Sequence, residues 1–250
     1  AVLTGRDKGK ERKAILERMA SGDLSVVIGT HALFQDEVLF HDLGLIVIDE
    51  QHRFGVSDRA RMVSKGFAPH VLVMSATPIP RTLALSIHGD MDLSILDEKP
   101  PGRMPIKTAT MPTSRMSEVI HGIAEAAKRG ERSYWVCPLI EESEAVDLAA
   151  VEDRYLELKT FFGKGVEIVH GRMPPTERET AMERFRAGES FLMVATTVIE
   201  VGVNVPEATI IVIEHAERFG LAQLHQLRGR VGRGDKQGSC VLLWKPPLGD

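Results

Sequence analysis

A chain of 250 residues with 43% hydrophobic and 26% charged side chains has an ordinary globular composition, which excludes a disordered or fibrous chain. The formal net charge of −4 excludes a strongly basic protein, so any contact with nucleic acid must come from local patches of lysine and arginine. Residues 1–100 carry 12 basic and 14 acidic side chains and the remainder carries 19 and 21, so neither part is basic by itself. The length favours two α/β domains over one.

The two cysteines, Cys137 and Cys240, lie in separate apolar runs without the spacing of a metal site, and we expect both to be buried reduced thiols. No apolar stretch reaches the length of a membrane span and no leader opens the chain, so we expect a cytoplasmic protein with no membrane partner. Residues 1–4 have the pattern of a strand end, so we expect the chain to begin inside a domain.

Short apolar runs alternate with helical patterns in the first part of the chain, which predicts a parallel sheet covered on both faces. A helix is expected over residues 10–20, because Ile15, Leu16 and Met19 share one face and Gly22 follows. The expected strands are 24–28, 43–48 and 70–74.

Two prolines and a glycine interrupt this alternation within residues 98–103. We therefore expect a first domain over residues 1–98 and a second over residues 99–250. In the second domain the expected helices are 116–128, 148–162, 175–186 and 221–228, and the expected strands are 106–110, 133–139, 166–169, 191–195, 210–214 and 239–244. These strands are enough for a complete sheet.

Two adjacent carboxylates, Asp49 and Glu50, follow the apolar run at residues 45–48. Ligands of open α/β sheets bind beyond the carboxyl ends of the strands. An Asp at that point can hold Mg²⁺ through water beside nucleotide phosphates, and the neighbouring Glu can deprotonate an attacking water. An isolated Asp-Glu pair is more often a helix N-cap followed by a solvated acid. The segments that follow favour the catalytic interpretation.

Small hydroxyl residues, Ser75 and Thr77, follow the expected strand at residues 70–74, and Pro78 then favours a turn. Hydroxyl groups there can hydrogen-bond the Asp49–Glu50 turn on a neighbouring strand and couple the nucleotide state to the rest of the domain. The Ser-Ala-Thr pattern is weak alone, because any strand can end in a polar turn.

Three arginines, Arg228, Arg230 and Arg233, lie on a glycine-punctuated turn after the expected helix at residues 221–228. Planar guanidinium groups match phosphate oxygens in a bidentate way, and an arginine at a γ-phosphate stabilises the charge of the transition state. The alternative is a basic surface turn that binds nothing in particular.

Strand ends with hydroxyls and glycines occur in both expected domains, at residues 29–31 and 195–206. Such ends are suited to phosphate contacts through side-chain hydroxyls and backbone N–H groups. Each alone is an ordinary strand-to-loop transition, but one in each domain predicts two contacts with the same nucleic-acid backbone.

Together these segments resemble the motifs of superfamily 2 helicases in order and spacing: Ib, II and III in residues 1–98, and IV, V and VI in residues 99–250. Residues 49–56, 77–83 and 219–233 are similar to the RecG family of bacterial branched-DNA translocases. The resemblance implies two RecA-like parallel-sheet α/β domains with the P-loop NTPase fold, the first truncated at its N-terminus. It also implies ATP and Mg²⁺ as cofactors, and an activity in replication fork reversal and Holliday junction branch migration.

The resemblance further implies roles for individual residues. Glu50 corresponds to the catalytic base, Asp49 to the Mg²⁺ ligand, and Arg230 and Arg233 to the γ-phosphate arginines. The remaining implied residues are Gln226, Gly202 and Asn204 at the nucleotide, His52, Ser75 and Thr77 in coupling, and Thr4, Gly5, Gly29, Thr30, Gly171 and Thr196 along the DNA. Asn204 stands where related motors commonly have Asp. The implied partners are branched or double-stranded DNA and single-strand DNA-binding protein, and we expect a monomer.

No Gly-x-x-x-x-Gly-Lys-Ser/Thr loop, which cradles the β- and γ-phosphates, occurs in the 250 residues. Residues 5–10 imitate it, but their spacing is short and Glu11 replaces the Mg²⁺-binding hydroxyl. We therefore expect these residues by themselves to be inactive in ATP hydrolysis. We expect the family's wedge domain and its segment after motif VI to lie outside these residues, in a longer protein of which they are a fragment.

Two other interpretations stay open. The chain can be a module that binds DNA without using ATP, since phosphate contacts dominate nonspecific binding. It can also be a transcription-repair coupling factor, a similar motor that acts on RNA polymerase. That family usually carries Asp-Glu-Glu-Gln-Arg at motif II, whereas this chain has Gln51 and His52 after Glu50, as RecG does.

Overall fold

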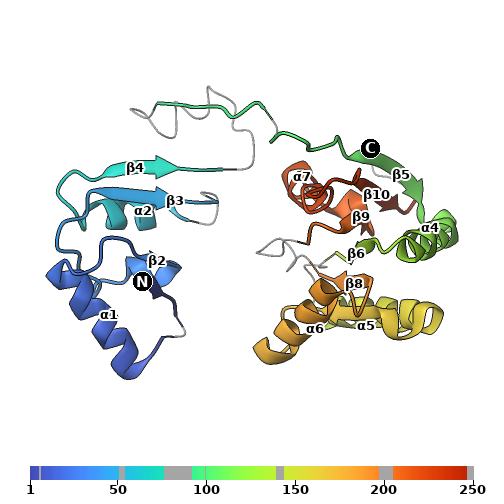
Figure 1. The fold of residues 1–250 in the computed structure, drawn as a ribbon, viewed down its shortest axis with the longest axis horizontal. Coiled ribbons are helices and arrows are strands. Elements are labelled where there is room, and N and C mark those ends of the chain that lie inside the picture. Colours follow the sequence, from blue (N-terminus) through green and yellow to red (C-terminus); the bar gives the residue numbers. More distant parts are fainter. Residues whose placement is uncertain are drawn as a thin grey trace. The chain divides into compact units, whose positions relative to one another are not determined.

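The computed structural model describes residues 1–5, 7–50, 54–75, 92–98, 100–138, 144–196 and 205–246 (Figure 1). The chain forms two compact units, Ala1–Ser86 and Ile87–Asp250. The domain boundary expected at residue 98 stays a prediction.

The unit Ile87–Asp250 is built on a six-stranded sheet in which every neighbouring pair of strands is parallel. The strands are β5 (Lys107–Pro112), β6 (Arg132–Val136), β7 (Val166–Val169), β8 (Leu192–Ala195), β9 (Ala208–Ile213) and β10 (Ser239–Trp244). Their spatial order is β5-β10-β9-β6-β8-β7, so β6 and β9 lie in the middle. The complete sheet expected from the sequence is confirmed.

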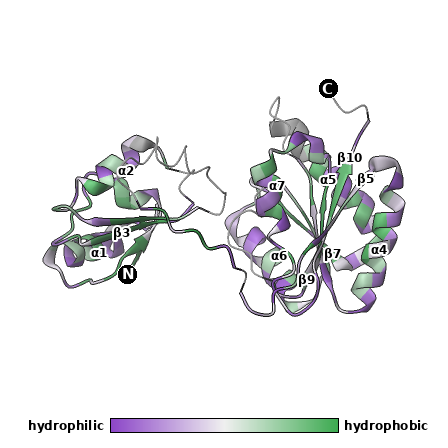
Figure 2. Cartoon of the chain, turned by 90° about the horizontal axis from the view of Figure 1, so that it is seen from above, coloured by the Kyte–Doolittle hydropathy of each residue, from purple (hydrophilic) through white to green (hydrophobic). Residues whose placement is uncertain are grey.

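Helices cover both faces of this sheet. They are α4 (Met116–Lys128), α5 (Glu144–Phe162), α6 (Pro175–Ala187) and α7 (Leu221–Arg228), with the 3-10 turns η3 (Thr113–Arg115), η4 (Gly163–Gly165) and η6 (Ala216–Arg218). Figure 2 shows α6 and α7 on one side of the strands and α4 on the other. Two apolar clusters match the two sides, because side chains alternate along each strand. Tyr134 packs in the cluster with α6 and α7, and Trp135 packs in the cluster with α4 and α5.

The unit Ala1–Ser86 contains two separate pairs of parallel strands among its described residues. Its elements are β1 (Val2–Leu3), α1 (Gly9–Ser21), β2 (Ile28–Gly29), η1 (His31–Phe34), β3 (Leu45–Ile48), α2 (Val56–Val63) and β4 (His70–Val73). β1 pairs with β2 and β3 pairs with β4, and each pair has its own small apolar cluster.

The expectation of a sheet covered on both faces is wrong for the described part of this unit. Ile46 and Ile48 are buried, whereas Leu45 and Val47 are 59% and 52% exposed. Since neighbouring side chains of a strand point to opposite faces, one face of β3 packs in the core and the other lies open. Ile28 of β2 is likewise 66% exposed.

Most predicted elements agree with the structure to within a few residues, and four of them, at 116–128, 166–169, 221–228 and 239–244, agree at both ends. Two predictions differ from the structure. The strand expected over residues 24–28 forms only at Ile28–Gly29, where it pairs with β1. Helix α2 was not predicted. Its signal was Asp58, whose carboxylate accepts a hydrogen bond from the N–H of Gly55 at the start of the helix.

A buried ion pair links the centre of the sheet to α5. Glu214 directly follows β9 and is 6% exposed. Its carboxylate accepts hydrogen bonds from Nε1 of Trp135 at 2.9 Å and from Nε and Nη2 of Arg154 at 2.9 and 2.6 Å. The guanidinium of Arg154 also lies 5.7 Å from the centre of the Trp135 ring. Glu214 therefore satisfies the N–H of Trp135 and two N–H groups of Arg154, while Nη1 of Arg154 donates to the exposed Glu157.

We predict that Glu214→Ala lowers the free energy of unfolding by about 3 kcal/mol, because it removes the buried acceptor of the Trp135 N–H and of two Arg154 N–H groups and leaves Arg154 its ion pair with the exposed Glu157. Glu214→Gln keeps a neutral acceptor and should lose roughly half as much. Urea unfolding followed by tryptophan fluorescence measures the loss, since both tryptophans, Trp135 and Trp244, belong to this unit. Glu118→Ala, which removes an exposed ion pair with Arg115, is the control and should cost under about 1 kcal/mol. Equal losses for Glu214→Ala and Glu118→Ala would contradict the prediction.

Two glycines after α7 allow a close approach of the backbone. Gly232 has a φ of +66°, and a Cβ atom there would lie 3.1 Å from the backbone N of Gly238. Gly238 is equally crowded, because its own Cβ would lie 3.0 Å from the Cα of Gly232. Because Gly232 and Gly238 have no side chain, the backbone between α7 and β10 can approach itself closely at these two residues.

Gly232→Ala should therefore destabilise this unit by about 1–2 kcal/mol more than Gly130→Ala. Gly130 also has a positive φ, of +72°, but nothing lies within 4 Å of the position of its Cβ, so it measures backbone strain alone. Thermal unfolding of both variants beside the unchanged chain gives the comparison. Equal destabilisation would show that the contact with Gly238 carries no cost.

Candidate functional site

The two candidate acids lie at the carboxyl end of β3, where the sequence placed them. Asp49 is exposed and Glu50 is half-buried. The N–H of Glu50 donates to Oδ1 of Asp49 at 2.9 Å, and Glu50 has a φ of +51°. Only three non-glycine residues in the described ranges have a positive φ, and such a conformation costs on the order of 1 kcal/mol. The chain thus turns sharply at the point where the candidate base is presented.

The acid pair offers one exposed carboxylate for a metal ion, that of Asp49. A hard cation such as Mg²⁺ commonly takes one or two carboxylates and completes its shell with water and phosphate oxygens. The ligand type therefore fits Mg²⁺. No group of three or more His, Cys, Asp or Glu side chains in the described part of the chain is placed to hold a metal ion by itself.

Strand pairing brings Ser75 to the same sheet edge as the acids. Ile48 of β3 is in register with Val73 of β4, and the N–H of Met74 donates to the carbonyl of Ile48 at 2.8 Å. Ser75 follows directly and is exposed. The other two candidates for coupling, His52 and Thr77, lie outside the described residues.

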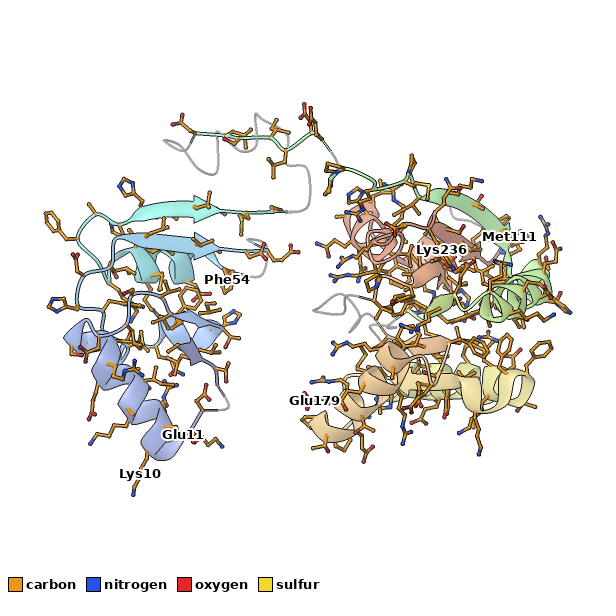
Figure 3. The ribbon with its side chains drawn as sticks, viewed as in Figure 1. Lys10, Glu11, Phe54, Met111, Glu179 and Lys236 are labelled. Atoms are coloured by element: carbon orange, nitrogen blue, oxygen red, sulfur yellow. The ribbon has the colours of Figure 1, made fainter. Side chains whose placement is uncertain are left out.

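An aromatic cluster lies near the candidate acids in the sequence and includes Phe54. The ring of Phe54, labelled in Figure 3, lies 4.8 Å from the ring of His31 and 5.2 Å from that of Phe34, both in η1. Phe54 is therefore packed against the turn that follows β2. Sequence reasoning missed Phe54, whose signal is a lone aromatic residue between two polar stretches.

The arginine-rich segment, residues 228–233, begins at the end of α7. Two fully buried side chains, Leu227 and Val231, hold it in place. Arg230 between them is half-buried, and Arg233 is exposed. The Nε of Arg233 donates to the carbonyl of Gly229 at 3.0 Å. Partial burial and the nearby positive charges of Arg230 and Arg103 lower the pKa of Arg233. The guanidinium groups of Arg103, Arg230 and Arg233 therefore lie close together, which favours the binding of an anion.

The remaining nucleotide candidates divide into two groups. Gln226 is half-buried on α7, one turn before Arg230, so the two come from the same short segment. Gly202 and Asn204 lie outside the described residues.

Among the DNA candidates of the unit Ala1–Ser86, Thr4 and Gly29 have structural partners. The N–H and Oγ1 of Thr4 both donate to Oδ2 of Asp7, at 2.6 and 2.8 Å, and these bonds lower the pKa of Asp7. A Cβ at Gly29 would lie 2.3 Å from the carbonyl oxygen of Leu3, so strand pairing alone requires glycine there. The N–H of Thr30 donates to the same carbonyl, and Gly5 is exposed with open space around it.

Gly171 and Thr196 follow the neighbouring strands β7 and β8, whose last residues are in register. Thr196 is 3% exposed, yet in the described ranges no group hydrogen-bonds its Oγ1. The same holds for Nδ1 of His170, which precedes Gly171. Buried polar atoms are normally satisfied, so two such atoms at adjacent strand ends favour a ligand contact. His170 was not predicted, although it follows β7 as Thr196 follows β8.

The two cysteines take no part in this arrangement. Both are free and buried, as the sequence predicted. Burial raises the pKa of Cys137, and it raises that of Cys240 to about 11, so neither thiol is reactive near neutral pH. No helix among the described residues has the length and apolar character that crossing a bilayer requires.

The chain is similar to known helicases along almost all of its length. Residues 1–85 match the family described as "DEAD/DEAH box helicase", and residues 114–235 match "Helicase conserved C-terminal domain". The ATP-dependent DNA helicase RecG of Acidithiobacillus ferridurans is 52% identical over 247 residues, which are 98% of this chain and 36% of that protein. RecG of Escherichia coli K12 is 52% identical over 252 residues, with the same coverage, and RecG of Bacillus subtilis is 49% identical over 248 residues. The chain thus spans about a third of the length of these relatives.

Solved structures agree with these sequence matches. A structure of RecG bound to a three-way DNA junction has a TM-score of 0.74 and 42% identity, covering 98% of this chain and 32% of that one. Yeast Dbp5 bound to RNA and ADP BeF3 has a TM-score of 0.68 at 15% identity, covering 99% of this chain and 64% of that one, which shows the fold alone. The chain is therefore homologous to RecG helicases over nearly its whole length, and its two units have the RecA-like parallel-sheet fold of helicases.

Proposed function

We propose that the protein containing these residues hydrolyses ATP to move along duplex DNA and to remodel branched DNA in recombination and repair. Reversal of replication forks and branch migration of Holliday junctions are the proposed reactions, and the cytoplasm is the proposed location. The proposal rests on the 52% identity with RecG helicases over 98% of the chain. A RecG relative bound to a three-way DNA junction supports the choice of branched DNA as the substrate.

In this proposal each charged residue has a role that its chemistry allows. Glu50 accepts a proton from the attacking water, and the sharp backbone turn at its φ of +51° presents it at the carboxyl end of β3. Asp49 holds Mg²⁺, which when bound neutralises charge on the phosphates. Arg230 and Arg233 donate to the γ-phosphate, where charge develops as the bond to the leaving group breaks. Gln226 contacts the nucleotide from the same segment as Arg230, and the roles of Gly202 and Asn204 at the nucleotide are proposed from resemblance.

Contacts with the DNA backbone are proposed for both units. The proposed residues are Thr4, Gly5, Gly29 and Thr30 in one unit, and Gly171 and Thr196 in the other. The buried hydroxyl of Thr196 supports its assignment, because a phosphate oxygen would supply the missing hydrogen-bond partner. Ser75 supports coupling by its position beside the acids, and His52 and Thr77 are assigned by resemblance. Single-strand DNA-binding protein is a second proposed partner, and a monomer is the proposed state.

We also propose that residues 1–250 by themselves do not turn over ATP. Arginines at the γ-phosphate supply one part of a composite phosphate site, and the Gly-x-x-x-x-Gly-Lys-Ser/Thr loop that supplies the other part does not occur in these residues.

DNA-stimulated phosphate release tests the roles of the acids. In a protein that contains this chain at the length of its relatives, Glu50→Gln should lower the rate at least about a hundredfold, because it removes the base but keeps the shape. The 250 residues alone should release no phosphate above background. Glu17→Gln, which alters an exposed acid of α1 in the same unit, should leave the rate unchanged. Turnover by the 250 residues that Glu50→Gln abolishes would contradict the proposed inactivity, and a longer protein unaffected by Glu50→Gln would contradict the role of Glu50.

A second candidate function is a module that binds DNA without ATP, and the gathered arginines of the unit Ile87–Asp250 favour it. Titrations of forked and linear duplexes at two salt concentrations separate the possibilities. We expect weak binding by the 250 residues that is equal for both duplexes and falls steeply with salt, because phosphate contacts dominate. A preference of these residues for the fork would show that branch recognition lies within them. The coupling-factor interpretation is not favoured, since the relatives that are 49–52% identical to this chain are RecG helicases.

A further inference from the structure

A tight turn before β5 lies against the arginine-rich segment, within the same unit. The N–H of Arg103 donates to the carbonyl of Pro100 at 3.2 Å, which closes a four-residue turn. Pro101 takes the second position of this turn, and Gly102, with a φ of +81°, takes the third. Proline followed by a left-handed glycine is the pattern of a type II β-turn. The backbone conformation before Arg103 is therefore set by the sequence of this turn.

Arg103 and Arg233 converge on one backbone oxygen. The carbonyl of Gly229 accepts Nε of Arg233 at 3.0 Å and lies 3.5 Å from Nη2 of Arg103, which donates to it weakly. The two guanidinium groups therefore lie side by side although 130 residues separate them in the sequence. Their mutual repulsion, with that of Arg230, is among the causes that lower the pKa of Arg233.

A hollow of about 330 Å³ opens between these two arginines. Its lining consists of Pro100, Pro101, Gly102, Arg103, Arg233, Gly234 and Asp235. In the described ranges neither Arg103 nor Arg233 forms an ion pair with a carboxylate, whereas Arg154 of the same unit pairs with Glu214. Asp235 brings one negative charge to the lining and Lys236, labelled in Figure 3, follows it. The hollow keeps a positive balance, which suits an oxyanion.

We propose that Arg103 is a further phosphate-binding residue, which acts with Arg233 in this hollow on the terminal phosphates of a nucleoside triphosphate. This inference rests on the proposed function and adds to it a residue from outside the helicase motifs. Two adjacent guanidinium groups can each donate two N–H groups to a phosphate, and a bound phosphate removes the repulsion between them. The Pro-Pro-Gly turn holds the backbone at Arg103, so little backbone freedom is lost on binding.

Titration calorimetry of the 250-residue chain with inorganic tripolyphosphate tests the proposal. Arg103→Gln and Arg233→Gln should each weaken binding about tenfold, because each removes one charge-assisted donor pair. Arg218→Gln removes the same charge from an exposed position of the same unit that does not line the hollow, and it should weaken binding less than about twofold. Arg103→Lys keeps the charge but not the planar fork, so it should lie between these values.

Three results would overturn the proposal. The first is an absence of saturable tripolyphosphate binding by the unchanged chain, and the second is an affinity of Arg103→Gln equal to that of Arg218→Gln. The third is a loss of affinity for a short duplex DNA in Arg103→Gln while tripolyphosphate binding is kept, because the hollow would then bind DNA phosphates. Unfolding curves of each variant show that the unit is intact, and Arg103→Lys serves if Arg103→Gln unfolds. Tripolyphosphate binding needs no turnover, so failure of the proposed ATP hydrolysis and failure of this proposal are separate results.

Discussion

In a parallel sheet all strands run the same way, and every candidate side chain that directly follows a strand depends on this constraint. Asp49 and Ser75 follow the paired strands β3 and β4, so they come to one edge without any contact between their side chains being required. Gly171 and Thr196 follow the paired strands β7 and β8 in the same way. The core holds these ends in place, because strands such as β8 are buried along their whole length.

The backbone conformation after a strand then sets the direction in which the chain continues from the sheet edge. Glu50 and His215 each lie two residues beyond the end of a strand, after β3 and β9, and both have a φ of +51°. A left-handed conformation turns the chain sharply at a small energetic cost. After β9 the preceding residue, Glu214, is anchored to Arg154, so the turn starts from a fixed point. The arginine-rich segment therefore follows a rigid sequence of strand, turn and helix.

The charges of the unit Ile87–Asp250 are used in two ways. Arg154 is compensated by a buried carboxylate and contributes to stability, whereas Arg103 and Arg233 are gathered around a hollow with little compensation. Gathering like charges costs free energy in the folded protein unless an anion binds, which is the reason to connect the hollow with phosphate. The balanced charge of the whole chain conceals this local concentration.

The sequence by itself determined the α/β class, the helices and strands of the second unit, and the family, because helical and strand periodicities and a few motifs such as residues 219–233 are local in the chain. It also placed Asp49 and Glu50 at a strand end. The sequence did not predict helix α2, whose start depends on a single capping carboxylate. It also did not predict the open face of β3, because that depends on what packs against the strand. Only the tertiary structure brought Arg103 to Arg233 and Glu214 to Arg154, because such pairs are separated by many residues and are set by the order in which strands pair.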